Sequence, residues 1–173
     1  MRFLQIFAVF LIPVGAIALA LTFRSSDSKP PLLVTPRTGS YEAVVGTPLS
    51  VTAFRVVNTS DSTVTLKRVR VLEPVSGLRV IGALAYRGCS TCVVDSAVPP
   101  SISSGTDAPP PPLLAVTSFR LKPGAQLTLL LSVSLSRAGR VHVPPLRMDV
   151  ETGSGVRNVE TVQGPELCAG KTC

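Results

Sequence analysis

Residues 126–135 alternate apolar and mostly polar side chains, and this pattern restricts the possible folds of the chain more than any other. The apolar phase consists of Leu127, Leu129, Leu131, Val133 and Leu135. Successive side chains of a β-strand point to opposite faces of its sheet. The pattern therefore predicts a half-buried strand, with one face in a core and the other in solvent. Leu130 belongs to the second phase, so we expect it to lie outside the core.

Seven other segments are rich in β-branched and aliphatic residues, with turn-forming residues between them, and are predicted strands. They are 41–45, 49–57, 63–72, 78–86, 113–121, 141–151 and 156–162. Gly153 and Ser154 separate the last two and predict a hairpin turn over residues 152–155. Pro144 and Pro145 predict an edge position or a kink within 141–151, because proline cannot donate a hydrogen bond to a neighbouring strand.

The segments 49–57 and 63–72 each change their apolar phase in the middle. A change of phase requires one extra residue, because the side-chain period of a strand is two. We therefore expect a β-bulge near Ala53 in the first segment and another at Lys67-Arg68 in the second.

These strands, with no helical period outside the N-terminal segment, predict an all-β fold. We expect an antiparallel sandwich of about seven or eight strands over residues 41–166. The stretch 98–112 is rich in proline and serine, and we expect it to form a long exposed loop of this domain rather than a strand.

Residues 49–58 have the pattern L-x-V-x-x-F-x-V-x-N, which resembles the opening strand of bacterial envelope immunoglobulin-like domains. The sequence L-K-P-G at 121–124, ahead of the long alternating strand, is similar to the lead-in of the domains grouped as CARDB-like and NEW3-like. The resemblance covers residues 41–162 and implies an immunoglobulin-like β-sandwich. It implies no particular activity, because such domains serve in adhesion, assembly and scaffolding alike.

Residues 3–23 contain no charged side chain, and a helix of that length crosses a hydrocarbon core of about 30 Å. We interpret residues 1–23 as a membrane anchor, so that the membrane is a binding partner of residues 3–23. The alternative is a secretory signal cleaved after one of the small residues Ala18 and Ala20. Residues 24–40 are rich in serine and proline and are predicted to form a stalk. Both interpretations place the following domain outside the cytoplasm, in the second case as a secreted protein.

The four cysteines, Cys89, Cys92, Cys168 and Cys173, are candidates for two disulfides, since an even number outside the cytoplasm favours pairing. The last two lie in a predicted tail over residues 167–173. Local pairing, Cys89 with Cys92 and Cys168 with Cys173, is preferred, and crossed pairing between the loop and the tail remains the alternative.

The Cys89-x-x-Cys92 spacing is also compatible with a thiol-redox centre, or with zinc held together with the second pair. A redox cysteine usually needs a helix N-terminus or a cation to lower its thiol pKa, and the expected setting here is a strand and a loop. His142 alternates with apolar neighbours and is expected to point to solvent. No known catalytic motif is present. Asn58-Thr59-Ser60 matches a glycosylation sequon, although a turn between strands is the preferred interpretation.

The chain carries 17 basic and 10 acidic side chains, a net charge of +7. The basic residues are mostly dispersed and few aromatic residues lie among them, which disfavours binding to nucleic acid. Because no known catalytic motif is present either, we expect that the protein is not an enzyme and has no cofactor and no small-molecule substrate. The predicted function is that of a membrane-anchored, extracytoplasmic binding or structural module of the cell envelope, with a possible envelope protein as partner. The alternative is a thiol-redox or metal-handling envelope protein that uses Cys89 and Cys92.

Overall fold

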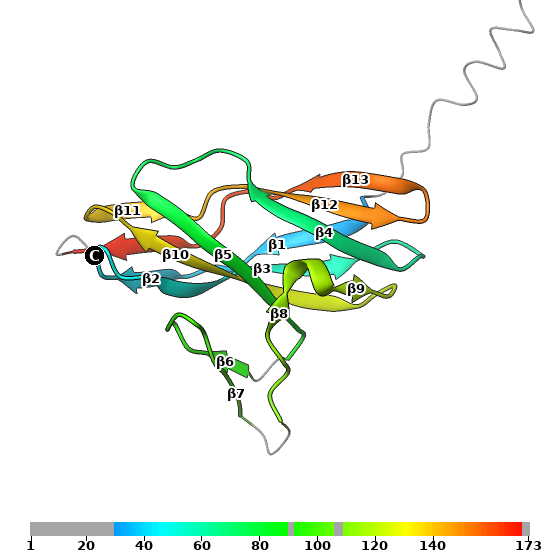
Figure 1. Ribbon diagram of the computed structural model, residues 1–173, viewed down its shortest axis with the longest axis horizontal. Helices are drawn as coiled ribbons and strands as arrows, with labels where there is room; N and C mark the ends of the chain where they lie inside the picture. The colour runs from blue at the N-terminus through cyan, green and yellow to red at the C-terminus, as the bar shows by residue number, and fades with distance from the viewer. Residues whose placement is uncertain (1–29, 90–91, 106–108, 171–173) are drawn as a thin grey trace, which may run out of the picture.

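A computed structural model of the chain describes residues 30–89, 92–105 and 109–170 (Figure 1). The predicted anchor or signal segment, residues 1–23, lies outside the described residues. So does the first part of the predicted stalk, up to residue 29. Within the described ranges, no helix has the length and apolar character needed to cross a membrane.

The regular secondary structure of the described residues consists of β-strands in four sheets and one 3-10 turn. The five-stranded sheet has the order β1 (Leu32–Pro36), β3 (Leu49–Asn58), β10 (Gln126–Leu135), β5 (Leu78–Arg87) and β8 (Leu114–Ala115). The four-stranded sheet has the order β13 (Gly155–Glu160), β12 (Leu146–Thr152), β4 (Val64–Val71) and β9 (Arg120–Leu121). The smaller sheets are β11 (Gly139–His142), β14 (Glu166–Ala169), β2 (Ser40–Ala43), and the hairpin of β6 (Cys92–Val94) with β7 (Ile102–Ser104).

The prediction of an all-β, antiparallel sandwich is confirmed, with one exception in the pairing. Every strand pair is antiparallel except β14 with β2, which is parallel. One apolar core joins side chains of the five-stranded and four-stranded sheets. Its fully buried members include Phe54, Leu66, Leu129, Leu131, Met148 and Val150. These side chains come from the apolar phases of β3, β4, β10 and β12, so binary patterning accounts for the core.

Both predicted β-bulges are present. The partner of β10 shifts from Phe54 to Thr52, which leaves Ala53 as the extra residue of β3. Lys67 is the extra residue of β4 in its pairing with β12. Ile81 of β5 forms a third, unpredicted irregularity opposite β10. The bulge at Ala53 turns both apolar phases of β3 toward the core, because a strand that gains one residue reverses its inward face.

Two predicted strands are each divided between sheets. Segment 113–121 forms β8 in the five-stranded sheet, then a 3-10 turn at Val116–Ser118, then β9 in the four-stranded sheet. Segment 141–151 is divided into β11 and β12 around Pro144 and Pro145, so the kink is correct and the single strand is wrong. In all, the described residues form fourteen strands, where about seven or eight were expected.

The predicted stalk and tail both contribute strands, which corrects their assignment. β1 lies within the expected stalk, yet it pairs along its length with β3 and buries Leu32. β14 includes the first residues of the expected tail, yet it lies between β11 and β2 and buries Leu167. Both strands are short, so they carry too few apolar positions to show a period in the sequence.

The strand β10 has the predicted bounds but not the predicted half-buried character. Leu130 is only 1 % exposed, as is Leu131 on the opposite phase. We call the side of the five-stranded sheet that bears Leu130, and is turned away from the four-stranded sheet, its outer face. Its buried members are Ser50, Tyr86, Thr128, Leu130 and Ser132. Both faces of β10 are therefore buried, and the prediction of a solvent-exposed second face is wrong.

Residues 88–113 connect β5 to β8, and we call this segment the excursion. In Figure 1 its hairpin, β6–β7, lies on the side of β10 opposite to β12 and β13, which is the outer face. The excursion contains most of the proline-rich stretch 98–112, which was expected to be exposed and unpaired. Most described residues of this stretch are exposed, as expected, but β7 pairs with β6 and Pro100 is buried. The excursion therefore lies on the same side of the sheet as the buried polar side chains of β10.

Candidate functional site

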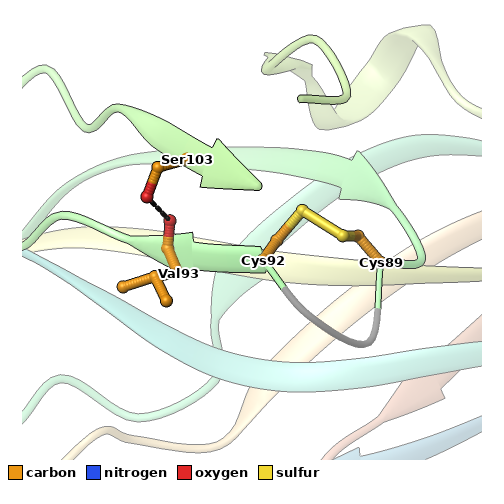
Figure 2. The surroundings of a disulfide bond; sticks show 4 residues. All are labelled: Cys89, Cys92, Val93 and Ser103. Atoms are coloured by element: carbon orange, nitrogen blue, oxygen red, sulfur yellow. Dashed lines mark hydrogen bonds between the residues drawn. A yellow bond between two sulfur atoms is a disulfide. The ribbon is translucent and has the colours of Figure 1, made fainter. Parts of the chain in front are cut away.

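The excursion begins with a disulfide between Cys89 and Cys92, directly after β5 (Figure 2). Their Cα atoms are 5.4 Å apart, and the bond closes a loop of three residue steps. Ser103 of β7 donates its hydroxyl to the carbonyl of Val93 at 3.5 Å, next to the disulfide. The local pairing predicted for Cys89 and Cys92 is thus the one observed, and crossed pairing of these two cysteines is wrong.

Cys168 is also disulfide-bonded, and it is buried in the middle of β14. The fourth cysteine, Cys173, lies outside the described residues. The described part of the chain contains no free cysteine. Its His, Cys, Asp and Glu side chains form no group of three or more that suits a metal ion.

Backbone hydrogen bonds attach the excursion to the five-stranded sheet at two places. The amide of Gly88 donates to the carbonyl of Gln126 at 3.4 Å, and the amide of Ser50 donates to the carbonyl of Ser96 at 2.7 Å. The hairpin itself exposes Val93, which is 66 % accessible. The excursion therefore combines a fixed base on the sheet with an apolar, accessible side chain.

A recess of about 250 Å³ lies beside the disulfide, where the excursion leaves the sheet. It is lined by Arg37, Arg55, Gly88, Cys89, Gln126 and Thr128. Arg37 follows β1 and is held to β3 by a hydrogen bond from its backbone amide to the carbonyl of Ala53 at 2.9 Å. Arg55 and Gln126 come from neighbouring strands, β3 and β10. Four separate parts of the chain thus meet at this recess.

The side chain of Gln126 fixes the position of the Arg55 guanidinium. Its Oε1 accepts from Arg55 Nε at 2.9 Å and also from Nη2 of the same group. Gly88 makes room for this arrangement, because a Cβ there would lie 2.5 Å from Gln126 Nε2 and 2.8 Å from its Cγ. The absence of a side chain at Gly88 therefore allows the amide and the guanidinium to meet.

The recess is electropositive, since two guanidinium groups and no carboxylate line it. On the four-stranded sheet, some basic groups are paired with carboxylates, such as Lys67 with Glu151 at 2.8 Å and Arg147 with Glu160 at 2.6 Å. Among the described residues, Arg37 and Arg55 make no such ion pair with a carboxylate. The positive charge of the recess is therefore not compensated by a carboxylate of the described residues.

The sequence did not single out Arg37, Arg55 or Gln126. The sequence does show that Arg55 and Gln126 are polar residues in strands that are mostly apolar. It does not show that they are neighbours, because that depends on the register between β3 and β10. His142 is exposed, as predicted, with Nδ1 3.4 Å from the carbonyl oxygen of Gly164.

Asn58 is 1 % exposed, and the turn interpretation of the Asn58-Thr59-Ser60 motif is confirmed. Its Nδ2 donates to the carbonyls of Ser62 at 2.8 Å and Leu121 at 2.9 Å. Its Oδ1 accepts from the amide of Ser60 at 2.9 Å. Because its amide nitrogen is buried and engaged, the sequon is not accessible for glycosylation in the folded domain.

Several solved structures are distantly similar to this chain. The VesB protease of Vibrio cholerae matches with a TM-score of 0.42 and 11 % identity over 80 % of this chain. This chain spans only 32 % of that protease. The seventh ASH/PapD-like domain of human CEP192 matches with a TM-score of 0.39 and 11 % identity, over 84 % of this chain and 92 % of that domain. No protein-family model and no curated protein matches the sequence.

Proposed function

We propose that this protein is a non-enzymatic, membrane-anchored and extracytoplasmic binding or structural module of the cell envelope. The sandwich is of the immunoglobulin-like kind, as the resemblance of residues 41–162 to bacterial envelope domains implies. Residues 3–23 attach it to the membrane, and its partner is another envelope protein. The excursion supports a binding role, because connecting segments on a rigid scaffold are where such folds place their contacts.

The observation that carries this proposal is the disulfide chemistry. Cys89 is bonded to Cys92, and Cys168 is bonded as well. Disulfides persist in oxidising compartments and are rare in the reducing cytosol. The bonded cysteines thus support the same extracytoplasmic location as the uncharged segment 3–23.

Thiol-redox activity is the second candidate, because Cys89 lines a recess that also contains Arg37 and Arg55. Cations near a thiolate lower the pKa of the thiol and increase its reactivity. However, Cys89 follows a strand and lacks the helix N-terminus that usually activates a C-x-x-C pair. We therefore rank this activity below binding.

Labelling of intact cells with a membrane-impermeant maleimide tests the proposal. We expect no labelling before reduction, labelling after mild reduction without lysis, and loss of the Cys89- and Cys92-specific adducts in the Cys89→Ser/Cys92→Ser variant. The protein should stay in the membrane fraction after a high-salt wash.

Each part of the proposal has its own contradicting outcome. Labelling that requires lysis would place the domain in the cytoplasm. Rapid labelling of Cys89 without reductant would favour the redox function. A mature chain that begins near residue 19 or 21 would replace the anchor with a cleaved signal.

A further inference from the structure

We propose that the recess between Arg37, Arg55 and Gln126 binds a carboxylate from an acidic segment of the protein partner. This inference rests on the proposed function as a binding module and names the chemistry that its partner presents. It starts from the composition of the recess, in which two guanidinium groups and a primary amide come from three different parts of the sandwich.

The donor groups of the recess outnumber its acceptors. Arginine has five N–H donors and no acceptor. Gln126 Oε1 engages Nε and Nη2 of Arg55, which leaves further N–H groups on that guanidinium. The Nε2 group of Gln126 adds another donor, and Thr128 adds a hydroxyl. A carboxylate accepts hydrogen bonds at both oxygens and pairs with the planar guanidinium in a bidentate manner.

The charge of the recess favours an anion. Arg37 and Arg55 line the same small volume, and neither has a carboxylate partner among the described residues. Like charges at short range repel one another, so an anion between them lowers the energy of the assembly. The orientation of Arg55 is already fixed by Gln126, so less side-chain entropy is lost when a ligand binds.

The surroundings of the recess favour a protein as the source of this carboxylate over a lipid headgroup. Cys89 forms one wall, and the exposed Val93 follows its disulfide partner in the sequence. Arginine is enriched in protein interfaces and among their energetically dominant residues. Membrane-surface sites rely on clusters of roughly four to eight Lys and Arg side chains. Only two basic side chains of the described residues, Arg37 and Arg55, line the recess.

The test measures binding of a fluorescent hexaglutamate peptide to the full-length chain in neutral detergent by anisotropy, with hexaglutamine as the uncharged control. We expect Arg37→Gln and Arg55→Gln each to weaken hexaglutamate binding by about tenfold, the loss of one good charged contact. Arg68→Gln is the matched control, because Arg68 is exposed on β4 in the other sheet and its replacement removes the same charge. It should change affinity by less than about twofold, as expected for a distant, screened charge.

A second variant tests the geometry without changing the charge. In Gly88→Ala the new Cβ would displace Gln126 from Arg55, so affinity should fall by about threefold to tenfold through the loss of preorganisation. Gly82→Ala is its control on β5, the strand that precedes Gly88, because a Cβ at Gly82 meets no atom within 4 Å. Circular dichroism and denaturant unfolding verify that each variant is folded.

Three outcomes would overturn the inference: no binding of hexaglutamate, equal weakening by Arg55→Gln and Arg68→Gln, or unchanged affinity in Arg55→Gln. Vesicles containing phosphatidylglycerol, and inorganic phosphate, form two further arms. Binding to either that depends on Arg55, without binding of hexaglutamate, would assign the recess to lipid or to free phosphate instead. The maleimide labelling of intact cells is independent of the binding measurement. If labelling succeeds and hexaglutamate does not bind, only the carboxylate site is wrong. If hexaglutamate binds and labelling requires lysis, only the extracytoplasmic location is wrong.

Discussion

The two faces of the five-stranded sheet are both buried, but they are made of different side chains. The inner face contributes Leu127, Leu129 and Leu131 to the main core. The outer face buries Ser50, Thr128 and Ser132 together with Leu130 and Tyr86. The inner face packs in the core shared with the second sheet, and the excursion lies on the side of the outer face (Figure 1). Alternation in a sequence thus identifies the apolar face of a strand but does not show that the other face is exposed to solvent.

The polar outer face has satisfied hydrogen bonds. No buried side-chain nitrogen or oxygen of the described residues lacks a partner. Ser50 Oγ lies 3.4 Å from Ser132 Oγ, and the Tyr41 hydroxyl bonds to both the amide and the carbonyl of Thr52, at 3.2 Å and 3.3 Å. The polar side chains of this face are therefore buried without an unsatisfied hydrogen bond.

The largest expected effect compares the two faces of one strand. Leu131→Ala opens a cavity in the main core and should lower the free energy of unfolding by about 2–5 kcal/mol. Leu130→Ala should cost a comparable amount, because Leu130 is as buried as Leu131. Urea unfolding followed by circular dichroism measures both. A loss at Leu130 below about 0.5 kcal/mol, as for a surface substitution, would mean that the outer face is open.

Removal of the Cys89–Cys92 disulfide should have a smaller effect. The closed loop is short, so the entropic stabilisation is at most about 2 kcal/mol. We expect Cys89→Ser/Cys92→Ser to unfold at a urea concentration close to that of the parent chain, but with faster amide exchange in β6 and β7. Hydrogen-exchange mass spectrometry measures this difference. Unchanged exchange in the hairpin would show that the disulfide does not hold the excursion on the outer face.

The buried serine pair gives the smallest expected effect. Ser132→Ala leaves the hydroxyl of Ser50 without its partner in a buried position, which should cost about 1 kcal/mol. The double variant Ser50→Ala/Ser132→Ala removes both groups and should be nearly neutral relative to Ser132→Ala. A double-mutant cycle of unfolding free energies measures the coupling. Strictly additive losses would show that the two hydroxyls do not interact across β3 and β10.

Much of the sandwich was predictable from the sequence because its long strands carry their own period. β10 has the predicted bounds, and the bulges at Ala53 and Lys67 follow from the change of apolar phase within β3 and β4. The divided segments were not predictable in this way. A strand that crosses from one sheet to the other, as at Pro144-Pro145, keeps its apolar pattern while its partners change.

The candidate site was predictable only in part. The Cys89–Cys92 bond follows from short spacing and compartment, which are local properties. The recess depends on cross-strand neighbours: Arg55 meets Gln126 only because β3 pairs with β10 in one particular register. Nothing in the sequence near Gly88 indicates that it must leave space for Gln126. Contacts between distant segments therefore carry the information that the sequence pattern lacks.

The most direct test of the covered outer face is the accessibility of Tyr86. The chain has two tyrosines and no tryptophan, so in Tyr41→Phe the emission reports Tyr86 alone. Tyr86 is 3 % exposed and belongs to the outer face. We expect acrylamide to quench this emission several-fold less in the native chain than in urea, because folded cover excludes the quencher. Native quenching equal to that of the urea-unfolded chain would contradict the account, since the outer face would then be open to solvent.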